Sequence, residues 1–126
     1  GYGKMYEEIY EHIKHLSCRY NVILIKSIDN PFPILKKCDL FILSSFYEAL
    51  GLALLEADTL KVPCISTDVK GPRGFMQKYG GTLVENSEEG LLKGMNDFMA
   101  GKIKCMNFDA EEYNKKIKEE YENIFK

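Results

Sequence analysis

The stretch CDLFILSSFYEALGLALLEADTLKVPCIST, residues 38–67, decides the fold class of this chain. It contains two short apolar runs, at residues 40–43 and 62–66, on either side of a segment at residues 49–60 that is typical of a helix. Strands that are apolar at every position are typical of a sheet covered on both faces, and a strand–helix–strand order connects parallel neighbours. The stretch therefore predicts a parallel α/β unit.

The same alternation continues on both sides of this unit. Apolar residues at helical spacing predict a helix at residues 4–16, and the run NVILIK at residues 21–26 predicts a further buried strand. The other elements expected are a turn at residues 29–33, short helices at 34–37 and 75–78, a glycine-bearing loop at 68–74 and a strand at 81–84. We therefore expect an α/β fold with a Rossmann-like parallel sheet, flanked by helices on both faces, in a single domain over residues 1–126.

Two helices complete the predicted order. Ser87 is a plausible N-cap for a helix that ends near Ala100, where Gly101 suits the C′ position. Asp109, with Glu112 three residues later, resembles a capping box at the start of a terminal helix. The apolar stripe expected on that helix consists of Tyr113, Ile117, Tyr121, Ile124 and Phe125. We expect the apolar stripes of the helices, including the first, to belong to the core. Part of the stripe on the terminal helix would be exposed instead if that helix crosses toward a further domain.

Composition and charge exclude several classes of protein. The 126 residues are 45% hydrophobic and 29% charged, as in a folded globular domain. Seventeen basic and nineteen acidic residues give a net charge of −2, whereas nucleic-acid binding requires a basic excess. No apolar run approaches the roughly 20 residues of a membrane span. The four cysteines are too sparse for a disulfide-stapled secreted domain, so we expect a cytoplasmic protein. No metal site is expected, because the four cysteines lie far apart and His12 and His15 stand alone.

The candidate site lies where the predicted strands end, because ligands of such folds bind beyond the carboxyl ends of the strands. The loops that follow the strands begin at Ser27, Ser44 and Thr67. Glu48 and Glu56 are eight positions apart, about 12 Å at helical rise, which exceeds the about 5–9.5 Å of a glycosidase carboxylate pair. They therefore favour two hydrogen-bonding positions along an extended ligand. The helix amides between them, which would suit a phosphate, belong to Ala49, Leu50, Gly51 and Leu52.

The residues alone leave a second interpretation of this pair equally open, in which Glu48 is a favourable charge at a helix start and Glu56 a solvated helix residue. A resemblance to a known family favours the first. Residues 45–57 are similar to the E-x7-E signature of the group 1 (GT-B, retaining) glycosyltransferases, and the flanking segments at 38–45, 62–68 and 80–86 are similar in order and spacing. The resemblance implies the nucleotide-sugar-binding, C-terminal half of a GT-B fold, without its N-terminal acceptor domain.

The resemblance also implies roles for individual residues. Glu48 would be catalytic and contact hydroxyls of the donor sugar, and Glu56 would accept both ribose hydroxyls. The loop at Ser27 and Ile28 would hold the base. Arg73 is unusual for the family at its position and would be either a phosphate contact or a surface cation. The implied reaction transfers a hexosyl group from a nucleoside diphosphate sugar with retention of configuration, without a cofactor or metal. Ala49 stands where the family usually has glycine, and the chain alone would be inactive.

The implied context is polysaccharide or cell-envelope glycan synthesis, with membrane contact only through the missing half, at the inner face of the membrane. A GT-B-type transferase of glycerophosphate or teichoic polymers is an alternative, as is a non-catalytic nucleotide-binding module. A receiver domain is disfavoured, because it would need a phosphoacceptor Asp after the third strand and an acidic cluster around it. Asp68 has no such cluster to join.

Overall fold

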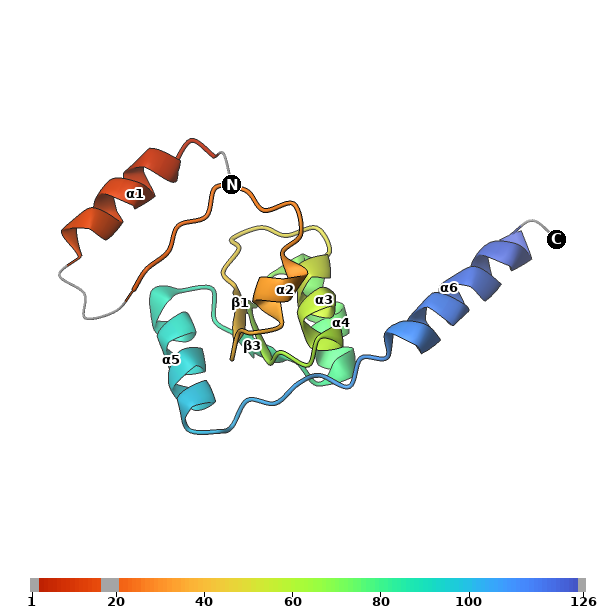
Figure 1. The fold of residues 1–126 in the computed structure, drawn as a ribbon. Helices are drawn as coiled ribbons and strands as arrows, with labels where there is room; N and C mark the ends of the chain where they lie inside the picture. The colour runs from red at the N-terminus through yellow and green to blue at the C-terminus, as the bar shows by residue number, and fades with distance from the viewer. Residues whose placement is uncertain (1–2, 17–20, 125–126) are drawn as a thin grey trace. The chain divides into compact units, whose positions relative to one another are not determined.

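The computed structural model describes residues 3–16 and 21–124 (Figure 1). The chain forms two compact units, Gly1–Pro31 and Phe32–Lys126. The first unit contains helix α1 (Tyr6–His15) and an irregular segment from Asn21 onward. The elements of the second unit are α2 (Phe32–Leu35), β1 (Phe41–Leu43), α3 (Leu52–Thr59), β2 (Cys64–Thr67), α4 (Lys70–Tyr79), β3 (Thr82–Val84), α5 (Glu88–Met99) and α6 (Ala110–Ile124).

The second unit is built on a parallel sheet with the strand order β1-β2-β3. Phe41 pairs with Cys64 between β1 and β2, and Ile65 pairs with Thr82 between β2 and β3. Helices α3 and α4 contact the sheet on one side, and α5 lies on the opposite side (Figure 1). This arrangement confirms the expected Rossmann-like sheet with helices on both faces.

The core lies between the sheet and α3 and α4. Its buried residues come from α3, β2, α4 and the segment before α6. On the other face, α5 approaches β2 and β3 closely because Gly94 has no side chain. A Cβ at this position would lie 2.9 Å from Val84 Cγ1 and 3.2 Å from Ile65 Cδ1. The buried core side chains are Leu54, Ala57, Val62, Cys64, Met76 and Met106.

The predicted ends of the last two helices are confirmed. Ser87 Oγ accepts a hydrogen bond from the Gly90 amide at 3.0 Å, which satisfies a donor in the first turn of α5. Gly101 has a φ of 72°, the left-handed conformation expected after the end of that helix. Asp109 Oδ1 accepts hydrogen bonds from the amides of Glu111 and Glu112 and so caps α6.

Two predictions for the chain are wrong. Residues 21–26 form no strand, and Ile23 is 79% exposed. A strand requires a hydrogen-bonded neighbour, which an apolar run by itself cannot supply. The apolar stripe of α1 also contributes no buried residue among those described. The stripe of α6 contributes none either, as the alternative stated for the terminal helix allows. Cys18 and Phe125 lie outside the described residues.

Three predicted helix boundaries also change. The helix expected over residues 49–60 begins at Leu52, because Gly51 adopts the left-handed conformation with a φ of 73°. Most of the loop expected at residues 68–74 belongs to α4, which begins at Lys70. Pro72 is tolerated there, since first-turn residues lack an intrahelical partner for their amide. The short helix α2 begins at Phe32, two residues before its predicted start.

Candidate functional site

The loop that follows β1 is folded around the side chain of Glu48. Glu48 Oε1 accepts hydrogen bonds from the amides of Ala49 at 3.0 Å and Gly51 at 3.2 Å. Thr67, at the end of β2, is buried and donates from Oγ1 to the Ser45 carbonyl at 2.6 Å. The end of β2 therefore holds the beginning of the loop, and the carboxylate of Glu48 holds its end.

The first turn of α4 lies directly against this loop. A Cβ on Gly71 would be 2.1 Å from the Glu48 carbonyl oxygen and 2.5 Å from that of Ala49. A Cβ on Gly51 would lie 3.2 Å from Pro72 Cβ. Only glycine at position 71 permits this approach, and it brings together the loops at the carboxyl ends of β1 and β2. This is the edge of a parallel sheet where ligands bind.

Two of the four amides predicted to be available for a phosphate already donate hydrogen bonds within the chain. The Glu48 carboxylate holds the amides of Ala49 and Gly51. The amides of Leu50 and Leu52 make no hydrogen bond within the described part of the chain. The residues around the loop therefore offer a fixed carboxylate and two amides.

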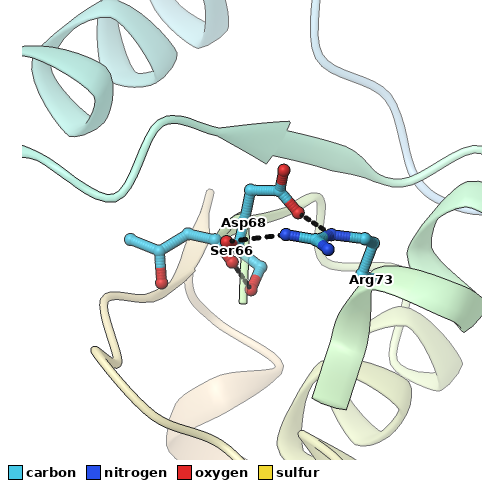
Figure 2. A network of polar contacts seen from close by, with 4 residues as sticks. Ser66, Asp68 and Arg73 are labelled. Carbon is cyan, nitrogen blue, oxygen red and sulfur yellow. Dashed lines mark hydrogen bonds and ion pairs between the residues drawn. The ribbon is translucent and has the colours of Figure 1, made fainter. Parts of the chain in front are cut away.

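Arg73 lies on α4 and pairs with Asp68, which follows β2. Figure 2 shows the guanidinium against this carboxylate, with Nε donating to Asp68 Oδ1 at 2.6 Å and Nη2 to the Asp68 carbonyl at 3.4 Å. In the same view, Ser66 Oγ donates to the Thr67 carbonyl at 2.9 Å. Both charged side chains are nearly half exposed, at 48% and 43%, so the pair contributes little to stability. It fixes the guanidinium beside the end of β2.

Glu56 lies on the second turn of α3, where it is exposed and lines a cavity of about 440 Å³. Glu48 and Glu56 thus belong to one unit. Glu48 lies in the loop after β1, and Glu56 lies on the helix that follows this loop. The helical estimate of their separation holds only from Leu52 onward, because the residues before Leu52 are not helical. Ser27 and Ile28 belong to the first unit, in the irregular segment before Pro31, and their assignment to base binding stays a prediction.

Sequence reasoning missed Asp58, a fully buried carboxyl on α3. Its Oδ1 accepts a hydrogen bond from the Met106 amide at 2.6 Å, which ties the segment before α6 to α3. Burial raises the pKa of Asp58, and the amides of Met106 and Phe108 oppose that rise. The available signal was an acidic residue directly after the apolar Ala57, on the side of α3 that faces the core.

Two other kinds of chemistry find little support in the described residues. Burial raises the pKa of the Cys64 thiol to about 12, so this side chain is a poor nucleophile near neutral pH. Within residues 3–16 and 21–124, no three His, Cys, Asp or Glu side chains gather as a metal site would require. In the same residues, no helix is both long and apolar enough to cross a membrane.

Comparison with known proteins identifies the family. The family described as Glycosyl transferases group 1 matches residues 1–116. The chain is 40% identical over 77 residues to the uncharacterized glycosyltransferase MJ1059 of Methanocaldococcus jannaschii, which covers 60% of this chain and 19% of that protein. It is 36% identical over 76 residues to the UDP-Gal:alpha-D-GlcNAc-diphosphoundecaprenol alpha-1,3-galactosyltransferase of Escherichia coli, covering 60% of this chain and 18% of that enzyme.

A third relative matches over most of the chain. The poly(ribitol-phosphate) alpha-N-acetylglucosaminyltransferase of Staphylococcus aureus (strain COL) is 29% identical over 123 residues, which is 94% of this chain and 24% of that enzyme. The chain spans only about a fifth of the length of these curated relatives. Because the family match extends over most of the sequence, the chain belongs to the group 1 glycosyltransferases.

Proposed function

We propose that this member of the group 1 glycosyltransferases is the donor-binding half of a retaining enzyme, and that it binds a nucleoside diphosphate sugar. The observation that supports this most directly is the close packing of Gly71 on the Glu48–Ala49 backbone. It joins two loops at the ligand-binding edge of the sheet, and the first of these loops holds the half-buried carboxylate of Glu48.

Glu48 is the proposed catalytic residue, and its hydrogen bonds suggest how it acts. An ionised carboxylate can accept about four hydrogen bonds. The amides of Ala49 and Gly51 take two of these at Oε1, so the side chain is oriented before a ligand arrives. Oε2 then accepts from a hydroxyl of the donor sugar. This orientation costs no rearrangement during the reaction.

The remaining proposed contacts hold the nucleotide. Glu56 accepts both ribose hydroxyls, since each of its carboxylate oxygens can take one donor. The amides of Leu50 and Leu52 at the start of α3 face the diphosphate, and Arg73 beside the end of β2 is a further cationic contact. Glu48, Glu56 and Asp68 place more negative than positive charge near this site. We therefore expect weak binding by this chain alone.

In the proposed reaction, the bond between the anomeric carbon and the diphosphate oxygen breaks, and the oxygen of an acceptor hydroxyl bonds to the anomeric carbon with retention of configuration. The proton of that hydroxyl leaves with the nucleoside diphosphate. We propose that no metal or cofactor takes part, because amides and cationic side chains stabilise the leaving diphosphate. An N-terminal acceptor domain would complete the active site, so this chain alone would not catalyse transfer.

The relatives suggest a class of acceptor. The names of two of them specify a sugar on diphosphoundecaprenol and poly(ribitol-phosphate) as acceptors. Another relative from Staphylococcus aureus is described as the capsular polysaccharide biosynthesis glycosyltransferase CapM, and it is 31% identical to this chain over 80 residues. We propose that the complete enzyme acts in the synthesis of a cell-envelope glycan, on the cytoplasmic side of the membrane.

A backbone amide NMR titration of the chain with UDP, GDP, CDP and ADP tests donor binding. We expect shifts at residues 48–56 that are lost in Glu56→Ala and retained in Glu119→Ala, an exposed glutamate of α6 outside the site. The shifts should persist in EDTA, because no metal is proposed. If no nucleotide moves these amides at millimolar concentration, the chain does not bind a donor.

A further inference from the structure

The loop after β1 exposes two aromatic rings directly before Glu48. Phe46 is 85% exposed and Tyr47 is 88% exposed, which makes them the most exposed large apolar side chains in the described part of the chain. Neither ring stacks on another ring within residues 3–16 and 21–124. We call Phe46 and Tyr47 the ring pair. Single exposed apolar residues need no explanation, but adjacent rings that the fold leaves in water indicate a binding surface.

The backbone is fixed on both sides of the ring pair. The Ser45 carbonyl, directly before it, accepts the 2.6 Å hydrogen bond from Thr67 Oγ1. The Glu48 carbonyl, directly after it, lies against Gly71, where an added Cβ would collide with this oxygen. Burying the rings would require breaking these contacts. A ligand therefore meets the ring pair on a loop that is already ordered, and binding does not have to order it.

The charges around the ring pair favour a neutral ligand with hydroxyl groups. Glu48 is the only charged residue between Leu40 and Leu55, and its side chain is half-buried. The surface of an anionic membrane would require cationic side chains here instead. A hydroxyl group can donate a hydrogen bond to the carboxylate. The face of a sugar ring also presents C–H bonds, which are attracted to the negative face of an aromatic ring.

We propose that the ring pair binds a sugar of the acceptor and so helps to determine which acceptor is used. The proposal rests on the proposed function, in which the donor extends from Glu48 toward Glu56. The ring pair precedes Glu48 in the loop, whereas the other donor contacts on this loop and helix follow it. A sugar stacked on the ring pair would therefore meet the donor sugar on the side away from the nucleotide. This gives the donor-binding half a direct part in the choice of acceptor.

An NMR titration with a neutral sugar tests the proposal. The probe is methyl N-acetyl-α-glucosaminide, at concentrations up to its solubility, and the control ligand is mannitol, an open-chain polyol. We expect the pyranoside to shift the signals of the ring pair, and saturation of the aromatic protons to transfer to the bound sugar. Mannitol should produce neither effect, because it has no ring face that can stack.

Substitution of the rings separates stacking from a general apolar contact. The double variant Phe46→Leu, Tyr47→Leu keeps two apolar side chains and removes both aromatic faces. We expect its affinity for the pyranoside to fall by roughly fivefold or more, the loss that removing favourable ring contacts produces. Tyr121→Leu removes an exposed tyrosine from α6 and should bind the pyranoside as wild type does. Amide spectra show whether each variant retains the fold.

Three results would overturn the proposal. The first is a wild-type chain whose ring pair does not respond to the pyranoside, or responds equally to mannitol. The second is unchanged affinity in the folded double variant. The third is displacement of the pyranoside by the sugar conjugate of the nucleotide that binds best, because the ring pair would then hold the donor sugar. We expect both ligands to bind at the same time.

The ring pair could instead join two copies of the chain. In that case its signals would depend on protein concentration without any sugar, and the double variant would remove this dependence, which also overturns the proposal.

The outcomes distinguish this proposal from the one on which it rests. If the wild type binds a nucleotide but not the pyranoside, only the assignment of the ring pair fails. If it binds the pyranoside through the ring pair but binds no nucleotide, the ring pair is upheld as a sugar-binding surface and the donor-binding function fails.

Discussion

Glu48 is a candidate both from its spacing in the sequence and from its hydrogen bonds in the structure. Its spacing from Glu56 identifies it as a candidate, but its partners are the amides of its own loop. The same carboxylate therefore stabilises the loop and would orient itself for a ligand. The sequence alone could not show these two roles, because the hydrogen bonds depend on the fold of the loop, in which Gly51 adopts the left-handed conformation.

The contribution of Glu48 to the stability of its loop can be measured by substitution. Glu48→Ala leaves the Ala49 and Gly51 amides without their acceptor and should lower the free energy of unfolding by about 1 kcal/mol. Glu48→Gln retains an oxygen that can accept both hydrogen bonds and should lower it by about half as much or less. Urea unfolding at pH 7 measures both. Equal stability of wild type and Glu48→Ala would contradict this stabilising role.

Asp58 should make stability depend on pH in the opposite direction from a salt-bridged carboxylate. Burial raises its pKa in the folded chain, so the folded state binds the proton more tightly than the unfolded state. Its contribution to the free energy of unfolding is fully present below about pH 4, the ordinary range of an Asp, and is lost as pH rises through the raised value.

Asp58→Asn removes this titration and keeps an oxygen that can accept from the Met106 amide. We expect the free energy of unfolding of wild type, relative to that of Asp58→Asn, to fall between pH 4 and pH 8. Urea unfolding across that range measures the difference. Parallel stability profiles for the two proteins would show that burial leaves the pKa of Asp58 unchanged.

At the scale of elements, the first turn of α4 is defined by its close contact with the backbone of the loop after β1. The Gly-Pro sequence at positions 71 and 72 predicts a loop. In the structure these residues form the first turn of α4, which contacts the loop after β1. A glycine signals a tight turn and a close contact equally well, and the contacting segment lies more than twenty residues earlier. Local sequence therefore could not identify the contact.

Two glycines of α4 provide a matched test of this contact. Gly71→Ala places a methyl group against backbone oxygens that cannot move aside, and should destabilise the chain by about 1–3 kcal/mol. Gly74→Ala is on the same helix, where an added Cβ meets nothing within 4 Å. It should stabilise the helix by roughly 0.5–1 kcal/mol. Thermal unfolding of both variants tests the prediction, and similar effects at the two positions would contradict it.

At the scale of the whole molecule, the parallel sheet was predictable and the cavity lined by Phe32, Phe108 and Tyr113 was not. Three apolar strands that alternate with helices predict the parallel sheet, because each helix must return the chain to the same edge. Phe32 and Phe108 follow no periodic pattern in the sequence, and the helical spacing that includes Tyr113 does not show which residues it meets. Asp58 ties the segment before α6 to α3, a contact between residues 48 positions apart that local sequence cannot predict.

The reactivity of the Cys64 thiol reports whether the sheet of the second unit is folded. This thiol is buried at the beginning of β2 in the centre of the sheet, and burial raises its pKa to about 12. At pH 8 a thiol with that pKa is ionised on the order of a thousandfold less often than one with the ordinary value near 8.5. Modification of Cys64 should therefore require unfolding of the sheet.

Two single-cysteine variants test this prediction. One retains only Cys64 and the other only Cys38, which is exposed, and the other cysteines of each are replaced by serine. In the folded chain at pH 8, a thiol reagent should modify Cys38 at least a hundredfold faster than Cys64, a ratio that includes the low thiolate fraction of Cys64. In urea that unfolds the chain, the two rates should become equal. Similar rates in the folded state would show that the sheet opens locally around β2 without global unfolding.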